Sequence, residues 1–237
     1  MKYKKVLLKL SGESLGGDKG SGIDETTLER YSKEIADVVS AGVGVAIVIG
    51  GGNIFRGLSG TNKGFDRVRG DQMGMLATVI NSIALSLFLK DVGIEAEVFT
   101  STPMKPYAEY YMRDKALELL NRGGVAIIAG GTGNPFFTTD SASALRAAEL
   151  GVSVLLKGTR VDGVYSADPE KDKNAVKYKT LTYDKALADN LKIMDLSAFT
   201  LCKENRIPII VFSMNLAGNL LKVVNGEEIG TVIADSF

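Results

Sequence analysis

The chain has 237 residues, 45% of them hydrophobic, which is enough to form a buried core. Its 28 basic residues balance its 28 acidic residues without any basic tract, which argues against nucleic acid or an anionic membrane as a partner. A single cysteine excludes an internal disulfide, and the absence of histidine excludes the commonest general base and the commonest metal ligand.

Short runs rich in β-branched residues alternate along the chain with longer segments of helical periodicity. The short runs predict strands over 4–10, 43–49, 94–99, 124–129, 153–157, 207–212 and 230–234. The periodic segments predict helices over 26–42, 70–93, 109–124, 140–151 and 194–207, with Asp24 as the N-cap of the first. This alternation predicts an α/β fold, a three-layer αβα sandwich around a mainly parallel, doubly wound sheet.

We expect a single domain over 1–237, because no linker or low-complexity tract interrupts the pattern. A polar stretch from about 159 to 184, with Asp-Gly and Asp-Pro turn signals, predicts a hairpin and surface excursion within it. The sequence contains no run of eighteen apolar residues, so we expect no transmembrane helix. The apolar run near the N-terminus is broken by Lys9 and lacks a small-residue cleavage site, so we expect a cytoplasmic protein.

Glycine-rich turns follow four of the predicted strands, at Gly12, 50–52, 130–133 and Gly158. In a doubly wound sheet the carboxyl ends of the strands share one edge, and ligands bind beyond that edge. Glycine lets backbone N–H groups approach an anion closely, but it also serves simply to close tight turns. Both interpretations stay open for any single loop, and the convergence of four loops favours an anion site.

Asp140 follows the third of these loops and precedes a predicted helix, where it could be no more than a helix N-cap. A second interpretation needs cations, and Lys9 and Lys157 end two apolar strands, where a lysine is costly unless it is paired or borders a site. Asp140 could then hold both ammonium groups towards a bound phosphate. The chain has neither a P-loop nor a strand-borne Rossmann motif, and charges distributed in this way suit phosphoryl transfer.

Six segments together resemble the bacterial uridylate kinases, which belong to the amino acid kinase fold family. They are "KLSGES" (9–14), "VIGGGNIFRG" (48–57), "RGDQMGMLAT" (69–78), "AGGTGNPFFTTDSASALRA" (129–147), "KGTRVDGVYSADP" (157–169) and "MDLSAFTL" (194–201). The resemblance covers nearly the whole chain in order. The strings "GTGNPFFTTD" and "GDQMGMLAT" are specific to uridylate kinases within that family, whereas the carbamate and acetylglutamate kinases share only the glycine loops.

The resemblance implies transfer of the γ-phosphoryl group of ATP to UMP, giving UDP and ADP in pyrimidine nucleotide biosynthesis. It implies Mg²⁺ accompanying ATP, with no dedicated metal cage in the protein. It also implies a homohexamer, activation by GTP and inhibition by UTP. Two alternatives stay open, namely a family member that acts on a carboxylate or a carbamate, and a non-catalytic nucleotide-binding homologue.

The resemblance further implies a role for individual residues. The catalytic set is Lys9, Asp140 and Lys157. The ATP-binding set is Lys9, Leu10, Ser11, Gly12, Gly52, Arg56, Thr159, Tyr165 and Asp168. The UMP-binding set is Gly51, Asp71, Thr132, Gly133, Asn134, Pro135, Phe136, Phe137, Thr138 and Thr139. The segment implied for activation by GTP is Gly17, Asp18, Lys19, Gly20, Ser21 and Gly22.

Several of these residues also have an interpretation that involves no ligand. Asp71 could be an acid favoured by the dipole at the N-terminus of a helix, and Arg56 could be a surface charge. Phe136 and Phe137 could be ordinary core residues. Asp168 lies in a composition typical of turns and could serve only the turn.

Overall fold

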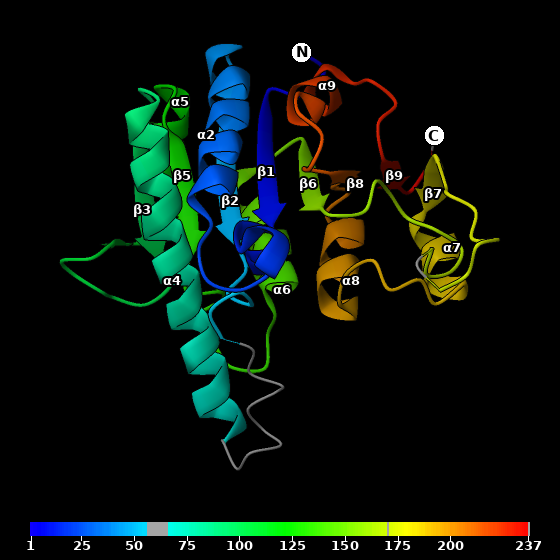
Figure 1. The fold of residues 1–237 in the computed structure, drawn as a ribbon, viewed down its shortest axis with the longest axis horizontal. Helices are drawn as coiled ribbons and strands as arrows, with labels where there is room; N and C mark the ends of the chain where they lie inside the picture. Colours follow the sequence, from blue (N-terminus) through cyan, green and yellow to red (C-terminus); the bar gives the residue numbers. More distant parts are fainter. Residues whose placement is uncertain (56–65, 170, 237) are drawn as a thin grey trace.

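The computed structural model describes residues 1–55, 66–169 and 171–236, and its centre is a nine-stranded sheet (Figure 1). The strands are β1 (Lys5–Leu10), β2 (Gly44–Ile49), β3 (Ala96–Thr100), β4 (Glu109–Tyr110), β5 (Val125–Ala129), β6 (Val154–Thr159), β7 (Thr180–Thr182), β8 (Ile209–Ser213) and β9 (Thr231–Ala234). They lie in the order β4-β3-β5-β2-β1-β6-β8-β9-β7, and every pairing is parallel except that of β8 with β9. The predicted mainly parallel sheet is confirmed.

Helices cover both faces of the sheet, as the prediction of three layers requires (Figure 1). One face carries α2 (Glu25–Ser40), α4 (Arg67–Asp91) and α9 (Asn219–Asn225), and the other carries α5 (Arg113–Asn121), α6 (Thr139–Leu150) and α8 (Leu196–Glu204). Shorter helical turns are α1 (Gly12–Leu15), η1 (Gly17–Lys19) and α7 (Tyr183–Ala188). The predicted N-cap of α2 is confirmed, because the Asp24 carboxylate accepts the Thr27 N–H at 2.7 Å.

The alternation of side chains along β1 decides which way its lysine points. Leu8 and Leu10 belong to the apolar cluster beneath α2, whereas Leu7 belongs to the cluster beneath α6. Successive residues of a strand face opposite sides of the sheet. Lys9 therefore points to the side of Leu7, where α6 lies.

The structure differs from the predicted elements at two short strands, and it also contains the helices α7 and α9, which were not among the predicted ones. Residues 109–112 do not form part of a helix, since Glu109–Tyr110 is β4, which pairs with β3, and α5 begins only at Arg113. In the polar stretch from 159 to 184, an antiparallel bridge joins Tyr165 to Lys177, in agreement with a hairpin, but the stretch ends in β7, which joins the main sheet. Strands of two or three residues are too short to produce a periodic pattern. The single-domain organisation stays a prediction.

By length and composition alone, α4 could cross a membrane. Its contacts are instead those of an outer layer of the sandwich, against α2, β3 and β5. The N-terminal half of α4 projects past the carboxyl edge of the sheet (Figure 1). This part of α4 therefore reaches the edge at which the glycine loops gather.

Candidate active site

Lys9 and Lys157 lie side by side at the carboxyl edge of the sheet. They are register partners in the neighbouring parallel strands β1 and β6, so their side chains leave the sheet on the same face. The Lys9 side chain is 11% exposed and that of Lys157 is 14% exposed. Like charges on facing strand positions repel each other, and burial strengthens the repulsion. The pair therefore needs an anion between its members.

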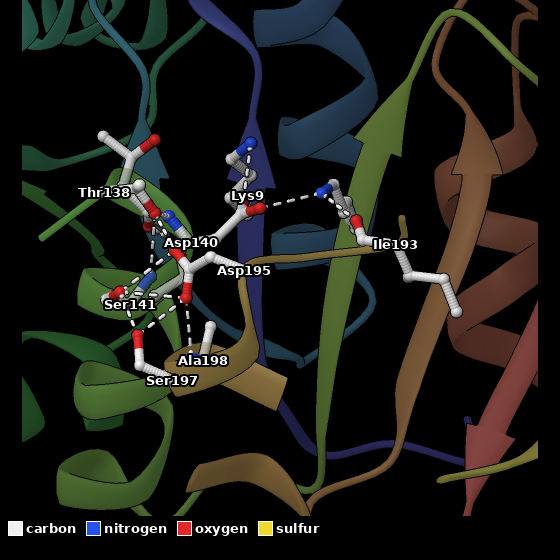
Figure 2. Close-up of polar contacts among 11 residues, drawn as sticks. Lys9, Thr138, Asp140, Ser141, Ile193, Asp195, Ser197 and Ala198 are labelled. Atoms are coloured by element: carbon white, nitrogen blue, oxygen red, sulfur yellow. Dashed lines mark hydrogen bonds and ion pairs between the residues drawn. The ribbon is translucent and has the colours of Figure 1, made fainter. Parts of the chain in front are cut away.

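Asp140 is that anion (Figure 2). Its Oδ1 lies 2.9 Å from Lys9 Nζ, and its Oδ2 lies 3.0 Å from Lys157 Nζ. Lys157 Nζ also donates to the backbone oxygen of Ile193 at 2.5 Å. One carboxylate thus holds two ammonium groups, and the cluster keeps a formal net charge of +1.

The N-cap of α6 is Thr138 and not Asp140. The Thr138 hydroxyl accepts the N–H groups of Asp140, at 3.1 Å, and of Ser141. Asp140 is the second residue of α6, so its side chain is free of the capping role and points to the lysines. The interpretation of Asp140 as a simple N-cap is therefore wrong, and the interpretation as a bridge between two lysines matches the geometry.

Asp195 is a site residue that the sequence did not single out, although it lies in the quoted segment "MDLSAFTL". It is the N-cap of α8, where it accepts the Ala198 N–H at 2.8 Å. Its carboxylate also accepts the hydroxyls of Thr138, of Ser141 at 3.0 Å and of Ser197 at 2.7 Å (Figure 2). An acid at the start of a predicted helical segment is an ordinary cap signal. The sequence could not reveal that this cap also fixes the start of α6.

The charges of the three buried groups depend on one another. Burial favours the neutral form of Asp140, but the ammonium groups of Lys9 and Lys157 outweigh it and hold the pKa of that carboxyl below its usual value. Burial lowers the pKa of Lys157, and Asp140 opposes this effect. Burial also acts against ionisation of Asp195, yet hydrogen bonds from Thr138, the Ala198 N–H, Ser197 and Ser141 lower its pKa. Both carboxyls are therefore ionised at neutral pH.

A cavity of about 570 Å³ opens on one side of the lysines. Its lining includes Lys157 and three residues implied for ATP, namely Thr159, Tyr165 and Asp168. The Tyr165 hydroxyl donates to Asp162 at 2.7 Å, and Lys177 donates to the same carboxylate. The volume lies within the range of small-ligand sites in proteins.

A smaller cavity, of about 130 Å³, lies beside the start of α6. Its lining includes Gly51, Asp71, Phe137, Thr138 and Thr139, all implied for UMP, and also Gly52, which was implied for ATP. Residues 138 and 139 directly precede Asp140, and Lys157 lines the larger cavity. The cluster therefore adjoins both cavities, through Lys157 on one side and through the start of α6 on the other, and Asp140 and Lys157 also line a third cavity of about 490 Å³.

Asp71 joins the start of α4 to the loop between β5 and α6. It accepts the backbone N–H of Phe136 at 2.8 Å and the Arg67 Nε at 2.9 Å. The helix begins at Arg67 and has Asp66 as its N-cap, so Asp71 lies beyond the first turn. The interpretation of Asp71 as an acid placed only for the helix dipole is therefore not supported.

The loop 130–138 presents its two phenylalanines to solvent. Phe136 is 64% exposed and Phe137 is 51% exposed, so the interpretation of both as core residues is wrong. Phe136 has a φ of 72°, a left-handed conformation that is unfavourable for a bulky side chain. Strain of this kind gathers at ligand sites, where the surrounding structure enforces it.

The remaining implied residues line neither of these two cavities. Leu10, Ser11 and Gly12 lie where β1 ends and α1 begins, and Thr132, Gly133, Asn134 and Pro135 form a turn in which Asn134 N–H donates to the Thr132 hydroxyl at 3.2 Å. Gly17 and Asp18 line a separate cavity of about 430 Å³ together with Arg30 and Arg160. Arg56 lies outside the described residues, so its role stays a prediction.

The site has acids but no cluster suited to a resident metal. Within 1–55, 66–169 and 171–236, no group of three or more His, Cys, Asp and Glu side chains is placed to hold an ion. The oxygens of Asp140 and Asp195 are engaged by ammonium and hydroxyl groups. A divalent cation here would take ligands from a nucleotide's phosphates, which is how Mg²⁺ is commonly bound.

The cap network gives a prediction about pH. The pKa of Asp195 is lower in the folded chain, so its carboxylate stabilises the fold above the unfolded pKa of about 3.9, and this stability is lost as the pH falls through the folded pKa. Asp195→Asn should lower the midpoint of urea unfolding at pH 7, and the difference from the wild type should shrink between pH 5 and 3. Asp114→Asn, with a side chain 90% exposed, is the control and should change little at either pH. An equal loss at both pH values would contradict the role given to the Asp195 charge.

We compared the sequence and the fold of this chain with those of known proteins. The model of the amino acid kinase family matches residues 4–213. A uridylate kinase of Bacteroides thetaiotaomicron is 60% identical over 232 residues, which is 98% of each chain. The crystal structures of UMP kinase from Bacillus anthracis (39% identity, TM-score 0.96, 100% of this chain and 98% of that chain) and Ureaplasma parvum (34% identity, TM-score 0.92, 99% and 100%) share the fold. The chain therefore belongs to the amino acid kinase family and, within it, groups with the uridylate kinases.

Proposed function

We propose that this chain transfers the γ-phosphoryl group of ATP to UMP, giving UDP and ADP. The observation that carries the proposal is the Lys9–Asp140–Lys157 cluster, which adjoins two cavities, one lined by residues implied for ATP and the other by residues implied for UMP. The relatives reported above are all named uridylate or UMP kinases. This favours UMP over a carboxylate or a carbamate as the acceptor, and an intact cationic cluster favours an enzyme over a binding protein.

The lysines supply what phosphoryl transfer most requires. The transferring group spreads negative charge over its outer oxygens, and the protein acts chiefly by positioning the reactants and stabilising that charge. Lys9 and Lys157 present ammonium groups that Asp140 holds in place before any substrate arrives. Because the groups are already oriented and largely shielded from water, little reorganisation is needed when the charge moves.

ATP occupies the larger cavity in this proposal, with its adenosine against Thr159, Tyr165 and Asp168. Its phosphates run towards Lys9, Lys157 and the glycine turn at Gly12, and Mg²⁺ enters with them. UMP occupies the smaller cavity, where Asp71 takes the ribose and the loop 132–139 surrounds the base. The N-terminus of α6, at Thr139, also directs the positive end of the helix dipole towards the UMP phosphate.

The proposal also covers regulation by nucleotides, the pathway and the cellular location. We take GTP as an activator acting through the segment 17–22 and UTP as an inhibitor, as the uridylate kinase resemblance implies. The reaction would serve pyrimidine nucleotide biosynthesis in the cytoplasm, and the chain would act as one domain. Gly17 and Asp18 border a cavity that also contains Arg30 and Arg160, and these arginines provide positive charge near that segment.

Homo-oligomer formation, as a hexamer, is the remaining part of the proposal. Four large apolar residues on α4 are 38–55% exposed, namely Met73, Leu76, Ile80 and Leu87. Their spacing of three, four and seven residues places them on one face of the helix. An exposed apolar stripe of this kind favours burial against a second copy of the chain.

The first prediction from the proposed function tests the Lys9–Asp140–Lys157 cluster. Lys9→Met should lower kcat on the order of 10²- to 10³-fold, because a preorganised charge that stabilises the moving phosphoryl group is lost. The KM for UMP should stay within about threefold, since its proposed contacts lie on other loops. Lys33→Met is a suitable control, because Lys33 is a surface lysine of α2 with a side chain 61% exposed. Steady-state rates from coupled ADP release measure both constants, and normal turnover in Lys9→Met would contradict the mechanism.

The second prediction concerns the base. Thr132 and Asn134 hydrogen-bond to each other, which fixes the turn at the start of the loop 132–139. We expect fixed polar groups of this loop to hydrogen-bond one edge of the uracil base. A site that hydrogen-bonds one base leaves groups unpaired against another, so kcat/KM for UMP should exceed that for CMP by on the order of 10²-fold or more. Rates with both nucleotides at fixed ATP measure the ratio. Equal values would indicate a broader pyrimidine monophosphate kinase.

The third prediction concerns assembly. The wild type should have a mass by light scattering close to six times the 25.2 kDa chain. Leu76→Glu combined with Ile80→Glu should reduce this mass, because charges would then face the interface. Leu216→Glu places a charge at another apolar residue that is 60% exposed, away from α4, and should leave the mass unchanged. A monomeric wild type at micromolar concentration would contradict the assembly.

A further inference from the structure

The part of α4 that reaches the carboxyl edge of the sheet contacts the glycine loops after both β2 and β5. At Gly51, a Cβ atom would lie 2.8 Å from the Cβ of Ala77 and 2.8 Å from the backbone oxygen of Gly74. Only glycine permits such a close approach of the loop to the helix. The loop that follows β2 therefore rests directly on the surface of α4.

Thr78 joins α4 to the second loop. Its hydroxyl accepts the backbone N–H of Gly130 at 2.9 Å and donates to the Met75 carbonyl of its own helix at 2.6 Å. Thr78 is 3% exposed, and Gly130 has a φ of 77°. A buried backbone N–H needs an acceptor, and here a side chain from another element provides it at the point where β5 turns into the loop.

Asn81 holds the first loop in the same way. Its Nδ2 donates to the Gly50 carbonyl at 2.8 Å and to Asn53 Oδ1 at 2.7 Å, and Asn81 is fully buried. In return Asn53 Nδ2 donates to Asn81 Oδ1 at 3.0 Å and to the Gly22 carbonyl at 2.6 Å. The two amides thereby connect the helix, the loop after β2 and the segment that precedes α2.

The turn after β1 depends on the same arrangement. A Cβ atom on Gly12 would lie 2.6 Å from the Gly50 carbonyl oxygen and 2.7 Å from Asn53 Oδ1. Any shift of the Asn53–Asn81 pair would therefore displace the backbone at Gly12, three residues after Lys9. Buried polar groups that satisfy one another in this way rigidify their surroundings.

We propose that Thr78 and Asn81 are positioning residues for phosphoryl transfer. They are three residues apart on one face of α4, and through Gly130 and Gly50 they hold the loops after β5 and β2 at one separation. That separation sets the distance between the UMP loop and the turns beside the lysines. The inference rests on the proposed function. Asn81 lines neither of the two cavities, whereas Thr78 forms part of the wall of the smaller one, and its hydroxyl is engaged by Gly130 and Met75.

The size of the expected effect follows from the demands of the reaction. A displacement of about 1 Å in the reacting groups can reduce a rate on the order of 10²-fold. Thr78→Val keeps the shape of the side chain but leaves the Gly130 N–H without its acceptor. Thr78→Ser keeps the hydroxyl. Asn81→Leu keeps the approximate volume but removes both amide donors, so the Gly50 carbonyl loses its partner.

Ser82→Ala is the matched control. Ser82 is buried on the same helix, beside Asn81, and its hydroxyl donates only to the Thr78 carbonyl at 2.8 Å, within the helix itself. Its removal disturbs the interior of α4 to a similar degree but breaks no contact with a loop. Rates and melting curves measured on the four variants therefore separate positioning from stability.

The experiment measures kcat and the KM for UMP and ATP by coupled ADP release, with a melting temperature for each variant. Thr78→Val and Asn81→Leu should lower kcat about 10- to 100-fold with both KM values within about threefold. Thr78→Ser and Ser82→Ala should stay within about twofold of the wild-type kcat, even where the melting temperature falls.

Two results would overturn the inference. One is a normal kcat in Thr78→Val, and the other is a loss of kcat in Ser82→Ala as large as in Thr78→Val. If Asn81→Leu does not fold, the Thr78 pair decides the matter alone. A wild type that does not phosphorylate UMP would refute the proposed function instead, whereas an active wild type with fully active variants would refute only the positioning role.

Discussion

The structure depends on one carboxylate held between two ammonium groups. Lys9 and Lys157 are register partners on neighbouring strands, and without Asp140 their side chains would repel each other in surroundings that screen charge poorly. The carboxylate must come from outside both strands, so β1, β6 and the start of α6 have to meet at one point. The order of the central strands and the entry of α6 are therefore constrained by the same electrostatic requirement that makes the site suitable for phosphates.

The entry of α6 is fixed from two sides. At its N-terminus, Asp195 accepts the hydroxyls of Thr138 and Ser141. Two turns further on, the buried Arg146 donates to the Ser101 hydroxyl at 3.1 Å, and that hydroxyl donates to the Gly131 carbonyl at 2.6 Å. The helix is thus tied both to α8 and to the loop that precedes it. Asp140 needs this support, because a carboxylate that drifts would no longer balance the two lysines.

The sequence predicted the sheet and the charged residues but not their geometry. Apolar strands and strand-end lysines leave a local signal, and so Lys9, Lys157 and Asp140 could be named together. The sequence could not show whether Asp140 caps the helix or bridges the lysines, because the answer depends on the exact residue at which α6 begins. In the structure the cap is Thr138. β4 and β7 were missed because such short edge strands lack periodicity. Asp195 acts through contacts with residues more than fifty positions away, which no local pattern contains.

Two faces of α4 make different contacts, although both belong to one helix. Thr78 and Asn81 face the loops after β5 and β2, whereas Leu76 and Ile80 are exposed on the outer side. Backbone hydrogen bonds between residues four apart run along the whole helix, so both faces belong to one continuous element. The proposed assembly through the outer stripe and the proposed positioning by Thr78 and Asn81 therefore use opposite sides of a single helix.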